Sequence, residues 1–162
     1  MQKPQLRRDP VSGDWVLVSP GRRSRPDQFR KKSDTPQPES ACPFEDPAST
    51  HKLLSWYDER GLQTGTPSKG WSVEVIENKY PAVAGHHGTC PVPPREGLFT
   101  LMDGVGFHEV VVTRSHTTSL GSMNVEEVAT VVRAYQDRFR AHMSEECLRY
   151  ILIFHNHGAD AG

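Results

Sequence analysis

Residues 124–144 read Asn-Val-Glu-Glu-Val-Ala-Thr-Val-Val-Arg-Ala-Tyr-Gln-Asp-Arg-Phe-Arg-Ala-His-Met-Ser, and this stretch decides the fold class. Asn124, with Glu127 three residues later, has the spacing of a capping box, which predicts that a helix begins here and continues to about Ser144. Asp137, Arg138 and Arg140 fall largely outside its apolar face. The apolar side chains recur at steps of three and four residues, as on one helical face, and are Val125, Val128, Val131, Val132, Tyr135, Phe139 and Met143.

Short apolar stretches on both sides of this helix predict β-strands at residues 15–19, 71–77, 108–113 and 150–154. The last of them, Tyr150-Ile-Leu-Ile-Phe154, is apolar on both faces, which favours a central strand that is covered on both sides. Several strands with one amphipathic helix packed on them predict the α+β class, here an antiparallel sheet with a helix on one face. Residues 30–51 and 84–98 are polar and rich in proline and glycine, so they predict two long loops.

The length and the charge set limits on what the protein does. The chain has 162 residues, enough for one domain with a core, although only 35% of them are hydrophobic. The formal net charge is −1, from 19 Lys+Arg and 20 Asp+Glu, which argues against a general nucleic-acid binder. Basic residues nevertheless outnumber acidic ones within residues 1–32, as expected either for an anionic small ligand or for a solvated surface.

The cysteines and the apolar runs bear on the cellular compartment. Three widely spaced cysteines, Cys42, Cys90 and Cys147, do not suggest a disulfide framework. No apolar run approaches the ~20 residues of a membrane span, and the first residues lack the apolar segment of a signal peptide. The sequence therefore predicts a protein in the reducing cytoplasm that has no membrane partner.

Two motifs at strand ends carry groups that bind nucleotides. Arg22 and Arg25 lie in the proline-bounded segment Ser19-Pro-Gly-Arg-Arg-Ser-Arg-Pro26, and guanidinium groups held in this way suit bidentate binding of phosphate. Asn78, followed by Lys79 and Tyr80, could bind a ribose hydroxyl or a base edge, with the tyrosine stacked on the base. The alternatives are a surface loop with exposed arginines and an ordinary turn that begins at an asparagine.

A third motif has the side chains of a metal site. Cys42 and Glu45 are spaced as C-x-x-E, a variant of the C-x-x-C hairpin, and His116 follows a predicted strand. Only three ligands are visible where a structural zinc needs four, so ordinary structural roles for these residues remain the alternative.

The last motif is Phe154-His-Asn-His-Gly-Ala-Asp-Ala-Gly162. Its small residues permit close approach of the backbone to a phosphate, and Asn156 offers a polar anchor beside them. His155 and His157 alternate with Asn156, and their spacing fits surface histidines better than a metal site.

The order of these motifs resembles the N-terminal half of the galactose-1-phosphate uridylyltransferase family, which belongs to the histidine-triad superfamily. The residues that carry the resemblance are Arg8 to Pro26, Cys-Pro-Phe at 42–44, Glu77-Asn-Lys-Tyr-Pro-Ala82, Gly106-Phe-His-Glu-Val-Val-Val112, His116 and Phe154-x-Asn-x-Gly158. The resemblance covers the whole chain and implies one nucleotide-binding half-domain of the histidine-triad type, residues 1–162.

The family resemblance implies a ping-pong nucleotidyl transfer in galactose metabolism, from UDP-glucose to a hexose 1-phosphate through a histidine nucleophile. By position, Arg22 and Arg25 contact the nucleotide phosphates, Asn78 with Lys79 contacts the nucleoside, and Asn156 and Gly162 contact the phosphate region. Cys42 and His116 match zinc-ligand positions, and Glu45 stands where many members have a second cysteine. A cytoplasmic homodimer is also expected.

The His-Pro-His-type motif of the family, which carries the nucleophile and another zinc ligand, is expected shortly after Gly162. We therefore predict that no residue of this chain is catalytic and that the chain alone transfers nothing. Two alternatives remain open: a relative that acts on an ADP-sugar, such as an ADP-sugar phosphorylase, and a nucleotide-binding module without activity. A central strand at 150–154 is expected to leave an open sheet edge and to favour oligomers.

Overall fold

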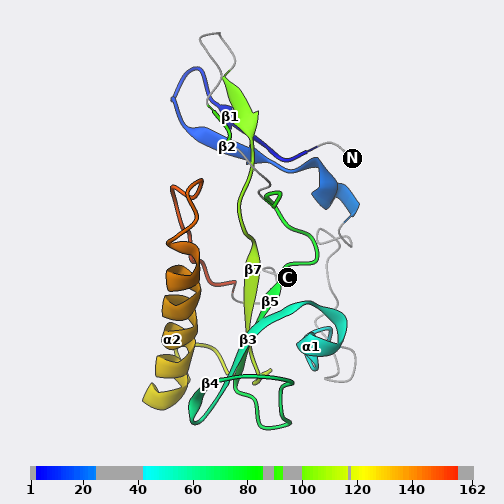
Figure 1. The fold of residues 1–162 in the computed structure, drawn as a ribbon, viewed down its shortest axis with the longest axis vertical. Coiled ribbons are helices and arrows are strands. Elements are labelled where there is room, and N and C mark those ends of the chain that lie inside the picture. Colours follow the sequence, from blue (N-terminus) through cyan, green and yellow to red (C-terminus); the bar gives the residue numbers. More distant parts are fainter. Residues whose placement is uncertain (1–2, 25–41, 86–89, 93–99, 117, 157–162) are drawn as a thin grey trace. The chain divides into compact units, whose positions relative to one another are not determined.

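A computed structural model describes residues 3–24, 42–85, 90–92, 100–116 and 118–156. The chain divides into two units, each assembled from three separate segments. Unit 1 comprises Met1–Pro26, Lys79–His108 and Glu145–Tyr150, and unit 2 comprises Asp27–Asn78, Glu109–Ser144 and Ile151–Gly162. Figure 1 shows the fold of the chain.

Unit 1 contains a three-stranded antiparallel sheet in the order β2-β1-β6, from Trp15–Val18, Gln5–Arg8 and Leu101–Asp103. The turn between β1 and β2 is stabilised by Asp9, whose Oδ1 accepts the N–H groups of Val11 at 2.7 Å and Ser12 at 3.0 Å. The strand predicted at 15–19 is thus confirmed, whereas β1 and β6 were not predicted. The 3-10 helix η1, Pro20–Ser24, follows β2 directly.

Unit 2 contains a four-stranded antiparallel sheet in the order β4-β3-β5-β7. The strands are Gly61–Gln63, Leu53–Asp58, Val73–Glu77 and Glu109–Thr113, and the helices are α1, Pro47–Thr50, and α2, Val125–His142. The two helices lie on opposite sides of this sheet (Figure 1). The α+β class is confirmed, and so are the predicted strands at β5 and β7. Within the predicted loop 30–51, residues 47–50 instead form α1, while residues 30–41 lie outside the described part.

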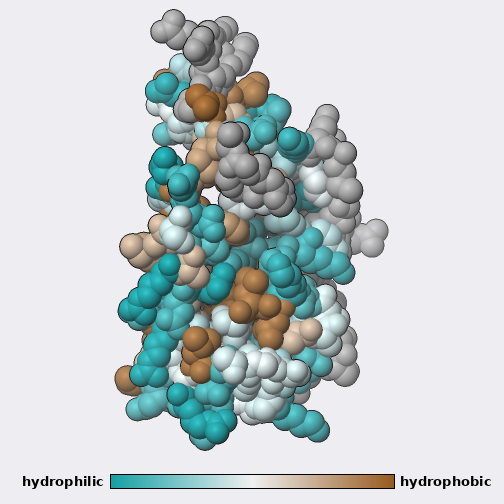
Figure 2. Space-filling view, viewed as in Figure 1, coloured by the Kyte–Doolittle hydropathy of each residue, from teal (hydrophilic) through white to brown (hydrophobic). Residues whose placement is uncertain are grey.

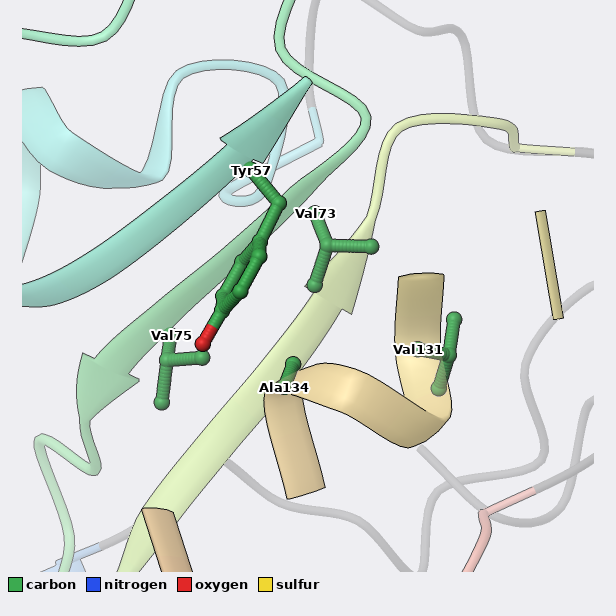
Figure 3. Packing of buried hydrophobic residues seen from close by; sticks show 5 residues of the cluster. All are labelled: Tyr57, Val73, Val75, Val131 and Ala134. Carbon is green, nitrogen blue, oxygen red and sulfur yellow. The ribbon is translucent and has the colours of Figure 1, made fainter. Parts of the chain in front are cut away.

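The sheet of unit 2 is buried on both faces. On the face toward α2, Tyr57, Val73 and Val75 pack against Val131 and Ala134 (Figure 3). The opposite face carries a second cluster, formed by Trp56, Trp71, Ile76 and Val112. Full burial of each of the larger side chains contributes about 1.5–3 kcal/mol, so the two clusters hold β3, β5 and β7 together.

Helix α2 begins with the predicted capping box. The Asn124 N–H donates to Glu127 Oε2 and the Glu127 N–H donates to Asn124 Oδ1, both at 2.9 Å. The predicted apolar face is only partly right, because the buried residues are Thr130, Val131 and Ala134. The predicted members at the edge of that face are exposed; they are Val125 (79%), Val132 (43%), Phe139 (45%) and Met143 (69%).

The central strand predicted at Tyr150–Phe154 is wrong. The described residues include no strand there, and Tyr150, Leu152, Ile153 and Phe154 are exposed. A strand needs a neighbouring strand to accept and donate its backbone hydrogen bonds, and apolar composition does not supply one. Hydrophobic residues also reach the surface elsewhere, and on the face in Figure 2 they lie in separate patches among hydrophilic ones.

The expectation of no disulfide is wrong as well. Cys90 and Cys147 are joined, across a sequence separation of 57 residues, within unit 1. Cys42 is a free cysteine. Of the helices that the structure describes, none has the length and apolar character needed to cross a membrane.

Candidate functional site

The structure brings Glu45 and His116 into direct contact, although 71 residues separate them in sequence. Glu45 follows the turn that begins at Cys42, where its N–H donates to the Cys42 carbonyl at 3.2 Å. His116 lies three residues beyond β7, and its Nε2 is 2.6 Å from Glu45 Oε2. The end of β7 and the Cys42 turn therefore meet in unit 2. Glu45 and His116 have to lie this close together if both are to bind one metal ion.

Arg114 adds a positive charge to this site that the sequence interpretation did not include. Its guanidinium lies over the buried Trp71 ring, 5.1 Å from the centroid, and its Nη2 is 3.9 Å from Glu45 Oε1. The Arg114 N–H also donates to the Ser72 carbonyl at 3.1 Å, which extends the pairing of β7 with β5. Stacking on an aromatic ring contributes about 0.5–1 kcal/mol at exposed sites, so the arginine is held beside the Glu45 carboxylate.

Cys42 is not gathered with Glu45 and His116 into one metal-binding group. Its Sγ accepts the Phe44 N–H at 3.4 Å. Within the described ranges, no three His, Cys, Asp or Glu side chains are grouped so that they could hold a metal ion. The structure thus joins two of the three predicted ligands, and the described side chains fit a zinc ion only in part.

The predicted nucleotide residues are divided between the two units. Arg22 lies in η1 of unit 1, where its N–H donates to the Ser19 carbonyl at 3.2 Å. Lys79, also in unit 1, is exposed, and its Nζ is 5.9 Å from the centroid of the Tyr80 ring. Arg25 lies outside the described residues. The role of Tyr80 in stacking on a base stays a prediction.

Asn78 and the Glu45–His116 pair lie at opposite ends of the strand pair β5–β7. Asn78 follows Glu77, which pairs with Glu109, whereas His116 follows the end at which Val73 pairs with Thr113. At about 3.4 Å per residue, the paired region separates the two ends by roughly 14 Å. The predicted nucleoside contact and the predicted metal ligands are therefore distinct sites. Asn156 is exposed in unit 2, and Gly162 lies outside the described residues.

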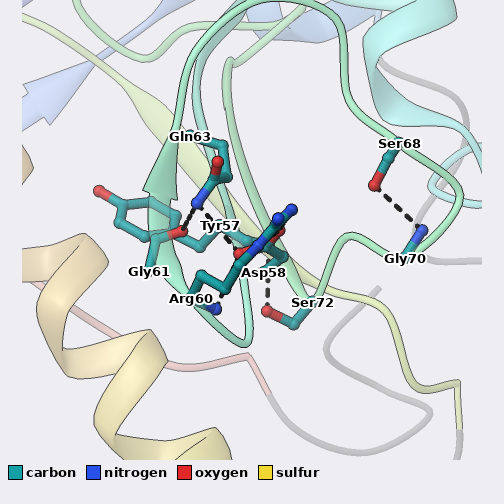
Figure 4. Close-up of polar contacts among 8 residues, drawn as sticks. All are labelled: Tyr57, Asp58, Arg60, Gly61, Gln63, Ser68, Gly70 and Ser72. Atoms are coloured by element: carbon teal, nitrogen blue, oxygen red, sulfur yellow. Dashed lines mark hydrogen bonds and ion pairs between the residues drawn. The ribbon is translucent and has the colours of Figure 1, made fainter.

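A cavity of about 530 Å³ in unit 2 lies between the β3–β4 hairpin and the first turns of α2, and no predicted site residue lines it. At its edge, Asp58 Oδ2 accepts Arg60 Nη2 at 2.7 Å, and Asp58 Oδ1 accepts Gln63 Nε2 at 3.1 Å (Figure 4). The hydrogen bonds from Arg60 hold the pKa of Asp58 below its ordinary value. These contacts stay within β3, β4 and their turn, so they stabilise the hairpin.

Sequence reasoning missed two carboxylates inside unit 2: Glu74 is fully buried, and the Glu109 side chain is 14% exposed. Glu109 accepts both Arg138 and His142, and Glu74 lies in the centre of the sheet. In the segment Trp71–Glu77, apolar and polar residues alternate, and Glu74 lies on the same face as Ser72. This pattern suggests that the face is exposed to solvent. The signal that could have revealed its burial is the isoleucine two residues later on the same face.

The fold has a solved counterpart of known class. A chain described as "Structure of uridylyltransferase" is similar to this chain with a TM-score of 0.50 and 25% sequence identity. The match covers 88% of this chain and 36% of that chain. The architecture of a uridylyltransferase thus accommodates most of the residues present here.

The particular family follows from the sequence. The chain matches, over residues 1–162, the family described as Galactose-1-phosphate uridyl transferase, N-terminal domain, and it belongs to that family. It is 33% identical to ADP-glucose phosphorylase of Arabidopsis thaliana, with 99% of this chain and 45% of that protein covered. It is 30% identical to galactose-1-phosphate uridylyltransferase of Thermotoga maritima, with 98% and 42% covered. The chain therefore spans less than half the length of these curated relatives.

Proposed function

We propose that the whole protein is a nucleotidyltransferase of the uridylyltransferase type, and that residues 1–162 form its N-terminal, nucleotide-binding half. The observation that carries the proposal is the family match along the full chain. The relative from Thermotoga maritima named galactose-1-phosphate uridylyltransferase supports the uridylyl donor. UDP-glucose and a hexose 1-phosphate are accordingly the proposed substrates, in galactose metabolism.

The proposed reaction has two displacements. In the first, a histidine nitrogen forms a bond to the α-phosphorus of the nucleotide sugar, the bond from that phosphorus to the bridging oxygen breaks, and a sugar 1-phosphate leaves. In the second, a phosphate oxygen of another sugar 1-phosphate attacks the same phosphorus and releases the histidine. Dividing one displacement into two lowers the barrier of each. The nucleophilic histidine belongs to the His-x-His motif that we propose beyond Gly162.

The residues of this chain bind and orient the nucleotide in this proposal. Arg22 and Arg25 contact the phosphates, Asn78 and Lys79 contact the nucleoside, and Asn156 and Gly162 contact the phosphate region. Support for the role of Asn78 comes from its place at the end of the buried strand β5, which fixes its backbone. In the whole protein, Asn78→Ala is expected to lower kcat/KM for UDP-glucose by about tenfold or more, whereas unchanged kinetics would remove Asn78 from the site.

The proposal is tested with a UDP-glucose donor labelled in the α-phosphate. We expect the whole protein to retain label after denaturation, through an acid-labile bond to histidine, and residues 1–162 alone to retain none. Retention of label by residues 1–162 would show that a nucleophile lies within this chain. Absence of label from the whole protein with any nucleotide sugar would overturn the reaction class.

A second candidate function is the transfer of an adenylyl group, as in an ADP-sugar phosphorylase. The relative that favours it is the Arabidopsis thaliana protein named ADP-glucose phosphorylase, at 33% identity. Thermal shift of the whole protein with UDP-glucose and with ADP-glucose separates the two, because the nucleotide that binds the folded state more tightly raises Tm more at equal concentration. A larger shift with ADP-glucose would favour the second function.

We also propose that the family resemblance extends to zinc, with Glu45, His116 and Cys42 as ligands. The contact between Glu45 and His116 supports this placement. A bound zinc would fix the Cys42 turn to the end of β7 as a structural cross-link. We expect metal analysis to find about one zinc per whole protein, and less in His116→Ala. Protein that contains no zinc after purification without chelators would contradict the proposal.

The homodimer and the cytoplasmic location remain proposals. Light scattering of the whole protein across a concentration series tests the dimer, and a constant monomer mass would exclude it. The disulfide bears on the location, because disulfides are rare in the cytosol. If the protein is cytoplasmic, we expect alkylation in intact cells to trap Cys90 and Cys147 as thiols; a disulfide that persists there would count against the location.

A further inference from the structure

Glu74 occupies a place where a carboxyl group is costly. It is fully buried in β5 and pairs in register with Trp56 of β3 and Val112 of β7. These two strand partners and Ile76, on the same face of the sheet, are apolar and belong to one buried cluster. A buried carboxyl group lowers stability unless hydrogen bonds or charges compensate it. Packing alone therefore gives no reason for a glutamate here.

Among the described residues, the Glu74 side chain makes one hydrogen bond, and it is directed at α1. Glu74 Oε2 accepts the Ala48 N–H at 3.1 Å, and Oε1 is buried with no hydrogen-bond partner among the described residues. The N-cap residue of α1, Asp46, makes no side-chain capping bond. The first N–H groups of a helix need acceptors from outside it, and Glu74 supplies one from the sheet in place of Asp46.

This bond lies next to the candidate site. Ala48 is three residues after Glu45, and the Cys42 turn comes directly before α1. One end of this short segment is fixed by Glu74 to the centre of β5. The other end is fixed by Glu45 to His116, beyond β7. Both attachments lead to the same sheet, so together they determine where the Cys42 turn lies.

We propose that Glu74 is a positioning residue, which holds α1 on the sheet and so sets the Cys42–Glu45 turn opposite His116. This inference rests on the proposed role of that turn and His116 as a binding site. It assigns a use to a buried carboxyl group that neither the metal ligands nor the nucleotide contacts account for.

The charge state of Glu74 does not weaken this role. Burial raises its pKa, the hydrogen bond from Ala48 lowers it, Asp46 raises it, and Arg114 lowers it, with a net rise. A carboxylate and a carboxylic acid both present an oxygen that accepts an N–H. The attachment of α1 is therefore expected to persist whether or not Glu74 is ionised.

Glu74→Leu tests the inference, with hydrogen exchange of the full chain as the measurement. Leucine fills much of the space, removes the acceptor and also removes the buried polar group, so we expect Tm to stay the same or rise. The Ala48 and Glu45 amides should exchange about tenfold faster or more, while β5 and β7 keep their protection. Glu74→Gln retains an acceptor oxygen and should restore most of the protection. Glu59→Leu, at an exposed position, is the matched control and should change nothing at residues 42–50.

Two results would overturn the inference. One is unchanged protection of Ala48 and Glu45 in Glu74→Leu. The other is a faster exchange that spreads equally over β3, β5 and β7 in both Glu74 variants, because that pattern indicates a general loss of packing. The exchange is measured on protein freed of metal with a chelator, so the result does not depend on a bound metal. If Glu74→Leu releases the turn and the wild-type protein holds no zinc, the zinc proposal alone fails.

Discussion

At the scale of the residue, Glu109 forms a charged polar contact between β7 of the sheet and α2. Its Oε2 accepts Arg138 Nε at 2.8 Å, and its Oε1 lies 2.7 Å from Arg138 Nη2 and 2.8 Å from His142 Nε2. Burial acts to raise the pKa of Glu109, but the hydrogen bonds from Arg138 and His142 outweigh it and hold the pKa below its ordinary value of 4.5. The carboxylate therefore stabilises the fold above pH 4.5, and this contribution declines as the pH falls through the lower, folded-state pKa.

We expect Glu109→Gln to lower the free energy of unfolding at pH 7 by about 2–3 kcal/mol, because it leaves the Arg138 guanidinium half-buried without its carboxylate. The difference from wild type should shrink as the pH is lowered below 4.5, the ordinary pKa of the group. Urea unfolding at pH 7 and at a pH below 4.5 measures this difference in free energy. Glu126→Gln, at an exposed position, is the control. Equal losses for the two variants would mean that the contact contributes nothing specific.

Residue types alone revealed some of these contacts and not others. Arg138 is one of the charged residues that the helical pattern places outside the apolar face, yet its long side chain reaches the largely shielded Glu109. Glu45 and His116 were predicted as partners because both are metal-ligand types. Arg114 was not predicted as part of this site. Its guanidinium is held beside Glu45 by stacking on Trp71. The pairing of β5 with β7 brings Trp71 and Arg114 together, and the sequence alone does not show that pairing.

At the scale of the element, the capping box of α2 gives a direct test of the helix boundary. Asn124→Ala removes the side-chain acceptor of the Glu127 N–H and should lower the free energy of unfolding by about 1 kcal/mol. Gln136→Ala, at an exposed position in the same helix, should leave stability unchanged or slightly higher. The measurement is urea unfolding followed by circular dichroism. A neutral Asn124→Ala would show that the first turn of α2 is frayed.

Some of the elements with local sequence signals were predicted, whereas β3, Leu53–Asp58, was missed despite its apolar residues. The spacing of Asn124 and Glu127 marked the start of α2, and β5 and β7 are short apolar segments bounded by turns. Strand β1 has the sequence Gln-Leu-Arg-Arg and carries no such signal, since it exists through its pairing with β2 and β6. Residues 150–154 show the opposite. Their β propensity is high, but the described residues offer no strand for them to pair with, and they form no strand.

At the scale of the whole molecule, the Cys90–Cys147 disulfide should contribute measurably to unit 1. By loop-closure entropy, a cross-link over 57 residues restricts the unfolded chain by up to about 4 kcal/mol. We expect the double variant Cys90→Ser with Cys147→Ser to lose about 2–4 kcal/mol of unfolding free energy. Thiol titration of the denatured wild-type protein should find one free thiol before reduction and three after it.

The control for this prediction is Cys42→Ser, which removes the free thiol and should leave the disulfide intact. Three thiols in the unreduced wild-type protein would show that the bond does not form. The sequence could not reveal the pair, because an odd number of widely spaced cysteines carries no pairing information. Proximity is produced by the fold of unit 1, which brings together segments 79–108 and 145–150.

The division of the chain has a consequence for the order of events on the ribosome. Each unit is built from three segments that alternate along the sequence, so the first segment of unit 1 emerges more than a hundred residues before its last. Neither unit has all of its segments until synthesis has passed residue 150. Early intermediates therefore expose β1, β2 and β3 without all their partners, and nascent protein should depend on chaperones until synthesis passes residue 150.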